Sequence, residues 1–215
     1  NPNSSHDFGK NIIPMMLNEN RSMWAYKFNG YWRDVGTIQA YWESNMDLIS
    51  RVPDFNLFDP AWKIYTLNHV KPAHYIGPNG SVKKSIVAEG CMIYGKVKNS
   101  VIFPGVYIDE DSEIEDSIIM MDSTIGKNTV IKQSIIGENV KVGSNVVMGI
   151  GENIENKVKP TLYYSGITVV GEEAEVPDNC RLGKNVVIDS HINANDYCSL
   201  NIESGESVLK GGECE

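Results

Sequence analysis

The sequence predicts a mainly β fold, in which a left-handed parallel β-helix of hexapeptide repeats follows a small α/β segment. Three observations predict it. A phrase of one serine and two branched aliphatic residues recurs from Ser85 onward at steps of 15, 17 and 17 residues. Smaller steps of about six residues divide each repeat. The first fifty residues lack this rhythm, so they belong to a different kind of structure.

The repeated phrase predicts coils that stack on one another. It reads Ser85-Ile86-Val87, Ser100-Val101-Ile102, Ser117-Ile118-Ile119 and Ser134-Ile135-Ile136. Strands this short cannot bury their apolar side chains alone, but stacking places each branched side chain over its equivalent one coil below. Three steps of about six residues form one coil of triangular section.

The turn residues agree with this prediction. Glycine and asparagine tolerate a left-handed backbone at little cost, as a tight corner requires. Both occur in four similar turns, Gly126-Lys127-Asn128, Gly137-Glu138-Asn139, Gly143-Ser144-Asn145 and Gly183-Lys184-Asn185. The rhythm breaks between Gly149 and Gly166, where we expect a loop that leaves the stack. The Gly149-Ile150-Gly151 sequence lacks the third glycine of a dinucleotide-binding loop.

Two hairpin strands are predicted before the repeats. Met23–Phe28 and Tyr31–Val35 flank Asn29-Gly30, which is a strong signal for a two-residue turn. Asp7 is a candidate cap for a short helix that has Pro14 in its first turn.

A second helix is expected after Thr37, a good N-cap residue. Its apolar and polar residues fall at helical spacing on two faces: Ile38, Tyr41, Trp42, Asn45 and Ile49 on one, and Gln39, Glu43 and Asp47 on the other. We therefore divide the chain into an α/β segment (1–55), a linker (56–75), a β-helix (76–205) and a tail (206–215).

Composition excludes several classes of protein. The net charge of −9 argues against nucleic-acid binding, and no apolar run reaches the roughly 18 residues of a membrane span. Four scattered cysteines argue against a zinc site and favour free thiols in a reducing cytoplasm. Because the chain opens at Asn1 rather than methionine, within apparently structured sequence, we expect a fragment of a longer polypeptide.

Two motifs carry a family resemblance. The sequences SHDFGKNIIP (residues 5–14) and GYWRDVGT (residues 30–37) resemble glucose-1-phosphate adenylyltransferase, also called ADP-glucose pyrophosphorylase. The stretches AYWESNMDL (40–48), LFD (57–59) and WKIYT (62–66) are similar to the helix and linker that follow in that family. The resemblance covers nearly the whole chain as a C-terminal fragment. The family's glycine-rich nucleotide loop would belong upstream, so the fragment alone is expected to be inactive.

The resemblance implies a reaction and its partners. ATP and glucose 1-phosphate give ADP-glucose, a glucosyl donor for bacterial glycogen, and pyrophosphate. Two polyanions must meet, so Mg²⁺ and basic side chains have to neutralise charge. The family further implies a homo-oligomer, which is a tetramer in the family, and a sugar-phosphate or nucleotide effector, whose residues the sequence does not identify.

Site residues follow from the same resemblance. Asp34 is the expected catalytic carboxylate and Mg²⁺ ligand, completed by a second aspartate from outside this chain. The substrate-binding candidates are Trp32 beside the glucose, Asp7 and Phe8 on the opposite wall, and Lys10 and Arg33 as phosphate contacts or residues that shape the pocket. Structural alternatives stay open: Asp34 ends a hairpin, Asp7 caps a helix, and Trp32 fills a core.

Two other functions compete with this one. A non-catalytic regulatory subunit of the same pathway would have lost the upstream loop or metal aspartate, although the retention of Trp32 and Asp34 argues against it. A hexapeptide acyltransferase would need a catalytic histidine beside a coenzyme A cleft. No histidine lies in the regular repeats between Val82 and Val147, which argues against that class.

Overall fold

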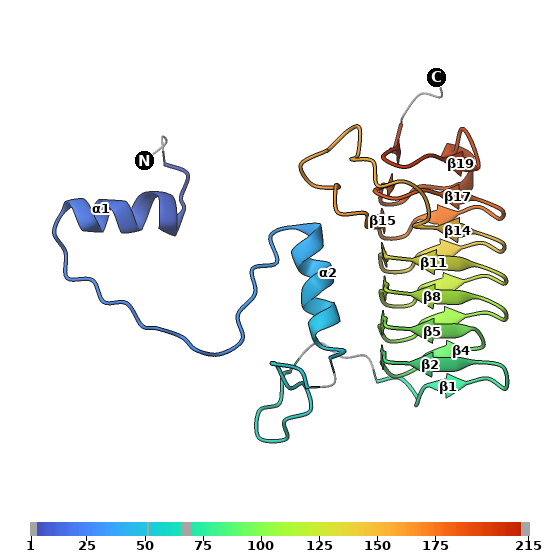
Figure 1. The fold of residues 1–215 in the computed structure, drawn as a ribbon, viewed down its shortest axis with the longest axis horizontal. Coiled ribbons are helices and arrows are strands. Elements are labelled where there is room, and N and C mark those ends of the chain that lie inside the picture. Colours follow the sequence, from blue (N-terminus) through green and yellow to red (C-terminus); the bar gives the residue numbers. More distant parts are fainter. Residues whose placement is uncertain (1–3, 51, 66–69, 212–215) are drawn as a thin grey trace. The chain divides into compact units, whose positions relative to one another are not determined.

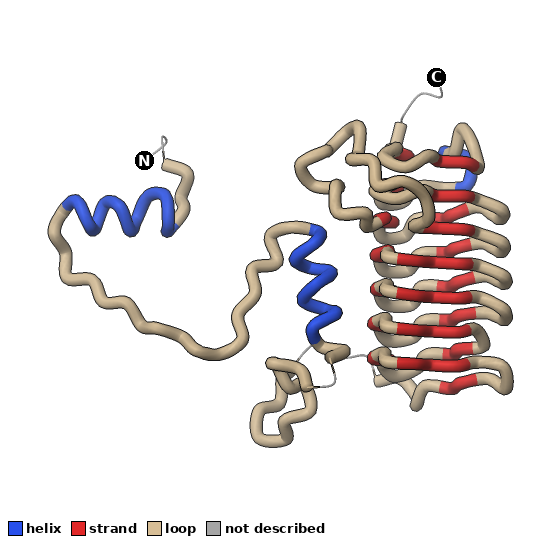
Figure 2. The backbone as a smooth tube through the Cα atoms, viewed as in Figure 1, coloured by secondary structure: helices blue, strands red, loops and turns tan. Residues whose placement is uncertain are grey.

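The computed structural model describes residues 4–50, 52–65 and 70–211. The chain divides into two compact units, Asn1–Tyr31 and Trp32–Glu215. Figure 1 and Figure 2 show the elements of each unit, and the units are described separately.

The first unit contains one short helical segment. A π-helical turn, η1 (Phe8–Ile12), runs into α1 (Ile13–Asn18). The Asp7 carboxylate caps this segment, because its Oδ1 accepts a hydrogen bond from the backbone N–H of Lys10 at 2.7 Å. Pro14 stands in the first turn of α1, where its missing N–H costs nothing. The helix predicted after Asp7 is confirmed.

The predicted hairpin is wrong. Residues 21–36 have irregular backbone rather than strands at Met23–Phe28 and Tyr31–Val35. Trp24 is 96% exposed and Tyr26 is 89% exposed, so the aromatic side chains have no core to enter. An isolated two-stranded ribbon is marginal in water unless its apolar face packs against a further layer. The described residues provide no such layer.

The predicted parallel β-helix is confirmed, with short strands in three parallel sheets (Figure 1). The first sheet contains β1 (Tyr75–Ile76), β4 (Met92–Ile93), β7 (Tyr107–Ile108), β10 (Thr124–Ile125), β13 (Lys141–Val142) and β16 (Glu175–Val176). The second contains β2 (Ser81–Lys83), β5 (Lys96–Lys98), β8 (Glu113–Glu115), β11 (Val130–Lys132), β14 (Val147–Met148), β17 (Arg181–Leu182) and β19 (Asn201–Ile202). The third contains β3 (Ile86–Val87), β6 (Val101–Ile102), β9 (Ile118–Ile119), β12 (Ser134–Ile136), β15 (Thr168–Val170), β18 (Val187–Ile188) and β20 (Ser207–Val208). A 3₁₀ turn, η2 (Ala194–Asp196), lies between the last coils.

The register explains the repeated phrase. Ile119 pairs with Ile102 on one side and Ile136 on the other, so the second aliphatic residue of each phrase stacks along the coils. These side chains are fully buried in the central core. The first aliphatic residue points the other way, because successive side chains of a strand alternate between faces. Ile118 and Ile135 therefore form a second, outer cluster.

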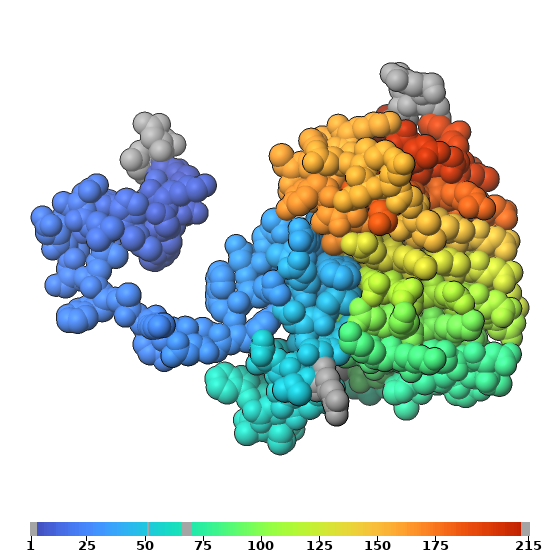
Figure 3. All heavy atoms as spheres, in the orientation of Figure 1, coloured from blue at the N-terminus to red at the C-terminus, as the bar shows by residue number. Residues whose placement is uncertain are grey.

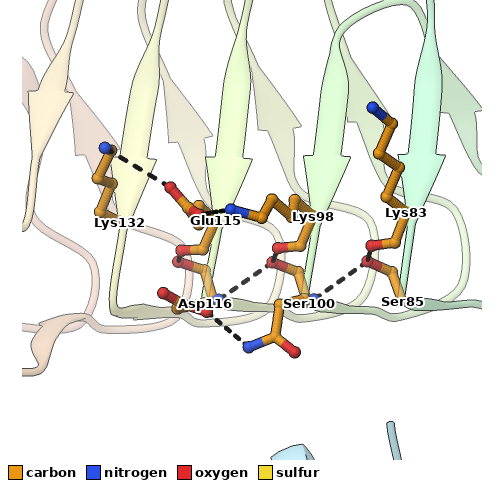
Figure 4. A network of polar contacts seen from close by, with 9 residues as sticks. Lys83, Ser85, Lys98, Ser100, Glu115, Asp116 and Lys132 are labelled. Atoms are coloured by element: carbon orange, nitrogen blue, oxygen red, sulfur yellow. Dashed lines mark hydrogen bonds and ion pairs between the residues drawn. The ribbon is translucent and has the colours of Figure 1, made fainter. Parts of the chain in front are cut away.

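The serine of each phrase forms a ladder at one corner (Figure 4). The Ser100 Oγ donates to the Lys98 carbonyl at 2.7 Å and accepts from the Ser117 N–H at 3.1 Å. The Ser117 Oγ repeats this pattern one coil further on. The ladder satisfies corner N–H groups that would otherwise be buried without a partner.

Asparagine and glycine have different structural roles in the turns. Asn128, Asn139 and Asn145 have φ between 54° and 59°, as predicted for a left-handed corner. The glycine of the same turns serves close approach instead. A Cβ atom at Gly126 would lie 2.7 Å from the backbone of Gly143 in the next coil. Glycine at this corner therefore leaves room for the backbone of the neighbouring coil.

The expected interruption is a loop between β14 and β15, over residues 149–167. It covers the upper coils in the space-filling view, where it is coloured orange (Figure 3). Asn156 anchors this loop and is 1% exposed. Its Nδ2 donates to the carbonyl oxygens of Asn185 at 3.0 Å and Glu206 at 3.1 Å. One side chain thus ties the loop to two coils.

Helix α2 (Ile38–Asp47) packs on the outer face of the third sheet, and Figure 3 shows its atoms against those of the coils. Thr37 caps it by accepting the Ala40 N–H at 3.1 Å, as predicted. Its apolar side packs against the outer cluster, through Ile38, Tyr41, Trp42 and Met46. The Trp42 Nε1 donates to the Asp116 carbonyl at 2.8 Å. Met120, in the same cluster, packs under α2 within the chain.

The end of the linker is attached to the first coils. Lys71 forms an ion pair with Asp122, and the Gly90 N–H donates to the Pro72 carbonyl at 2.6 Å. Gly105 has φ of 76°, and a Cβ atom there would collide with both partners of the ion pair. Glycine at this corner therefore leaves room for the Lys71 side chain.

The cysteines only partly meet the expectation of free thiols. Cys91 and Cys180 are free and buried. Burial raises the pKa of the Cys180 thiol to about 11, so it stays protonated and unreactive. The expectation is wrong for Cys198, which is disulfide-bonded, and Cys214 lies outside the described residues. Within the described ranges, no helix has the length and apolarity that crossing a bilayer requires.

A buried hydroxyl gives a first testable prediction. The Tyr197 Oη is buried and has no hydrogen-bond partner among the described residues. Burial also raises the pKa of this phenol. Because an unsatisfied buried hydroxyl costs free energy, Tyr197→Phe is expected to raise the free energy of unfolding by about 1 kcal/mol. Urea denaturation measures the change. Tyr65→Phe is the control, since that tyrosine is 88% exposed, and a loss of stability in Tyr197→Phe would contradict the prediction.

A charge ladder gives a second prediction (Figure 4). Glu115 lies between Lys98, with which it forms an ion pair, and Lys132 at 3.6 Å. The Lys98 hydrogen bond lowers the pKa of Glu115 below 4.5. The stabilisation is therefore complete above about pH 4.5 and disappears as the pH falls through the folded-state pKa. The difference in melting temperature between the wild type and Glu115→Gln should shrink from pH 7 to pH 3. A constant difference would refute this.

Candidate functional site

Asp34 lies in an exposed turn just before α2. Its Oδ1 accepts a hydrogen bond from the backbone N–H of Gly36 at 3.1 Å, which fixes the carboxylate within the turn. A Cβ atom at Gly36 would lie 3.3 Å from the same oxygen, so glycine leaves the carboxylate its room. The structure gives Oδ2 no hydrogen-bond partner among the described residues. Asp34 thus presents one fixed oxygen and one available oxygen to solvent.

The neighbouring Arg33 points to α2. Its Nη2 lies 2.7 Å from the Asp47 Oδ2, its Nε donates to the same oxygen at 3.2 Å, and its Nη1 lies 3.0 Å from the Glu43 Oε2. Glu43 and Asp47 are one helical turn apart on the polar face of α2, so both reach one guanidinium. The fork geometry of arginine suits such a double contact.

Trp32 is the third of the predicted site residues that lie in the second unit. Its side chain is 75% exposed, so the alternative of a core tryptophan is wrong. An exposed aromatic ring and an exposed carboxylate two positions apart in the chain are two features that suit a sugar, whose C–H faces pack on aromatic rings while its hydroxyls seek polar partners.

The other three predicted site residues lie in the first unit. Phe8 is 74% exposed, and Asp7 and Lys10 are exposed as well. Asp7 acts here as the helix cap that the sequence allowed as an alternative. Its contact with a substrate, like those of Phe8 and Lys10, stays a prediction.

The residues present fit a partial magnesium site. Mg²⁺ takes one or two protein carboxylates and fills its shell with water and phosphate oxygens. Asp34 offers such a carboxylate in an exposed turn, whereas Glu43 and Asp47 are engaged by Arg33. In the described part of the chain, no group of three or more histidine, cysteine, aspartate or glutamate side chains is placed to hold a metal ion.

Sequence reasoning missed the residues that hold this segment in place. Glu43 and Asp47 were predicted only as a polar helix face, and Trp42 only as part of the apolar face. The available signal was the combination of an arginine just before the helix with two acidic residues four positions apart on one helix face.

Comparison with known protein families indicates the class of protein to which the chain belongs. The family described as "Nucleotidyl transferase" matches residues 1–51, and the family described as "GlmU-like, C-terminal hexapeptide" matches residues 71–170. A nucleotidyl transferase segment followed by a left-handed hexapeptide β-helix places the chain in the class of proteins that combine these two domains, and this order fits a C-terminal fragment.

Comparison with similar proteins identifies the family. A glucose-1-phosphate adenylyltransferase of Acetivibrio thermocellus is 78% identical over the whole chain, and one of Ruminiclostridium cellulolyticum is 58% identical over 99% of it. One of Thermotoga maritima is 48% identical over 97% of the chain. The chain spans about half the length of these relatives. The chain belongs to the glucose-1-phosphate adenylyltransferase family.

Proposed function

We propose that the polypeptide containing this chain is a glucose-1-phosphate adenylyltransferase, which converts ATP and glucose 1-phosphate to ADP-glucose and pyrophosphate. The observation that carries the proposal is the match between almost the whole of this chain and about half of each of two enzymes of that name. The exposed Trp32 and Asp34, two positions apart in the chain, support it from the structure. The product would serve bacterial glycogen synthesis in the cytoplasm.

Asp34 is the catalytic residue that we propose for this chain. When bound, Mg²⁺ would neutralise the phosphate charges that otherwise oppose attack on the α-phosphorus of ATP. Asp34 would hold the ion through its available Oδ2, while the Gly36 N–H keeps the carboxylate oriented. A carboxylate already fixed before the substrates arrive needs little reorganisation during the reaction.

Trp32, Asp7, Phe8 and Lys10 are the substrate-binding residues that we propose. Trp32 and Phe8 offer exposed rings to the glucose, and Asp7 is an acceptor for its hydroxyl groups. Lys10 offers a cation to a phosphate. Arg33 was predicted to contact phosphate or shape the pocket, and its engagement with α2 favours the second role.

An assay of product formation tests the function. The complete polypeptide, including the segment by which the relatives are longer, is incubated with ATP, glucose 1-phosphate and Mg²⁺, and ADP-glucose is measured by chromatography. ADP-glucose should form with the complete polypeptide and not with residues 1–215 alone. Absence of product from the complete polypeptide, with intact folding by circular dichroism, would contradict the proposal and favour a regulatory subunit.

The same proposal includes a homo-oligomer, tetrameric by resemblance, and a sugar-phosphate or nucleotide effector. Light scattering of the complete polypeptide determines the oligomeric state. A panel of sugar phosphates and nucleotides in the product assay tests the effector.

A further inference from the structure

We infer that Arg33 is a positioning residue, which holds the Trp32–Gly36 segment on α2 and thereby on the β-helix; the inference rests on the proposed function of Asp34 and deepens it. Arg33 stands between Trp32 and Asp34, so any restraint on its side chain restrains both neighbours. Its guanidinium contacts two carboxylates at 2.7 Å and 3.0 Å, and all three side chains are about one-third exposed. Partial burial makes such a forked pair more persistent than a fully exposed ion pair.

The restraint on this segment also depends on how α2 is packed on the β-helix. The face opposite Glu43 and Asp47 packs against Ile118 and Ile135 of the third sheet. The Trp42 indole adds a hydrogen bond to the corner carbonyl of Asp116. Ile118 is fully buried beneath the helix, and the coils around it are joined by continuous ladders. A helix fixed on such a surface is a rigid base for the Arg33 contact.

Only Val35 and Gly36 separate Asp34 from Thr37, the N-cap of α2, so the connection between the turn and the helix is short. The turn from Asp34 ends in the N-cap of α2, where the Thr37 side chain accepts the Ala40 N–H. The segment is thus held at two places: covalently at the helix cap, and through the guanidinium further along the same helix. Two attachments fix the direction of the turn, whereas the cap alone would leave it free to pivot.

This arrangement distinguishes two roles for Arg33. If the guanidinium contacted a phosphate directly, loss of Glu43 and Asp47 would release it and leave activity unchanged or higher. If it positions Asp34, loss of the two carboxylates would be as harmful as loss of the arginine, and the two changes would not add. A misplacement of about 1 Å at a reacting centre lowers rates by as much as ~100-fold.

The test is a double-mutant cycle in the complete polypeptide. Arg33→Ala and the pair Glu43→Gln with Asp47→Asn should each lower kcat by about tenfold or more and raise the Mg²⁺ concentration for half-maximal activity. The combined variant should be within about twofold of Arg33→Ala, because the contacts act as one unit. Lys141→Ala, which removes an exposed ion pair to Glu175 on the first sheet, is the control and should match the wild type.

Hydrogen exchange provides a readout that does not depend on activity. Peptides covering residues 32–36 should exchange faster in Arg33→Ala and in the Glu43→Gln, Asp47→Asn variant, whereas peptides covering residues 118–136 should not change. Full activity of the carboxylate variant, or unchanged exchange at residues 32–36, would overturn the inference. An inactive wild type would count against the proposed function alone, and exchange would then decide the positioning role.

Discussion

Replacing Asp34 with asparagine in the complete polypeptide is expected to lower kcat for ADP-glucose synthesis by at least about 100-fold, the scale seen when a fixed electrostatic group is removed from an active site. The substitution keeps the size and the Oδ1 acceptor for the Gly36 N–H, so the turn should persist. It removes the negative charge with which the available oxygen would attract Mg²⁺. The measurement is steady-state kinetics as a function of Mg²⁺ concentration.

Asp59→Asn is the matched control for this prediction. Asp59 is also an exposed aspartate whose Oδ1 accepts a nearby backbone N–H, that of Ala61 at 2.8 Å, but it lies in the linker. This control should retain wild-type kcat and Mg²⁺ dependence. If Asp34→Asn retained them as well, Asp34 would have no catalytic role.

Replacing Asn156 with alanine is expected to lower the free energy of unfolding by about 3 kcal/mol, because several buried polar groups lose their partner at once. The Asn156 Oδ1 accepts the backbone N–H groups of Val158 at 3.0 Å and Lys159 at 2.9 Å. Its Nδ2 donates to two carbonyl oxygens in different coils. Removal of the amide thus leaves donors and acceptors unsatisfied on both sides of the loop.

Two further variants sharpen that prediction. Asn156→Asp keeps the size but turns a carboxylate oxygen toward carbonyl oxygens, so it should destabilise at least as much as alanine at pH 7. Glu152→Ala removes an exposed side chain in the same loop and should change stability by less than about 0.5 kcal/mol. Urea denaturation gives the free energies. Equal stability of Asn156→Ala and Glu152→Ala would show that the loop is not anchored as the structure indicates.

The repeat made the β-helix predictable from sequence. The step of 17 residues from Ser100 to Ser117 is also the spacing of the coils, since Ser117 donates its N–H to the Ser100 Oγ. The phrase also contains both faces of the strand: Ile119 enters the core, and Ile118 lies outward. The sequence did not indicate what covers Ile118, because the covering residues come from α2, more than seventy positions earlier in the chain.

The hairpin shows where local signals fail. Asn29-Gly30 is a strong turn signal, but a ribbon also needs a surface for side chains such as Trp24 and Tyr26. The described residues leave both exposed. Turn chemistry is read from two residues, whereas the burial that stabilises the strands depends on partners that the local sequence does not contain.

The sequence predicted which residues form the candidate site but not how their side chains are arranged. The resemblance named Trp32, Arg33 and Asp34 from one motif, and the structure places all three on one exposed segment. The resemblance did not indicate that Arg33 would turn toward Glu43 and Asp47, because ion pairing depends on how the segment enters the helix. Likewise, Asp7 has a cap role that local sequence explains fully, and its proposed role in substrate binding requires a bound sugar to test.

The most direct test of the account is a crystal structure of the complete polypeptide with Mg²⁺ and ADP-glucose. The account predicts that an Asp34 carboxylate oxygen binds Mg²⁺ at about 2.1 Å, or through one water molecule, while Arg33 remains on Glu43 and Asp47. A bound ion coordinated without Asp34, with this turn facing away from the nucleotide sugar, would contradict it.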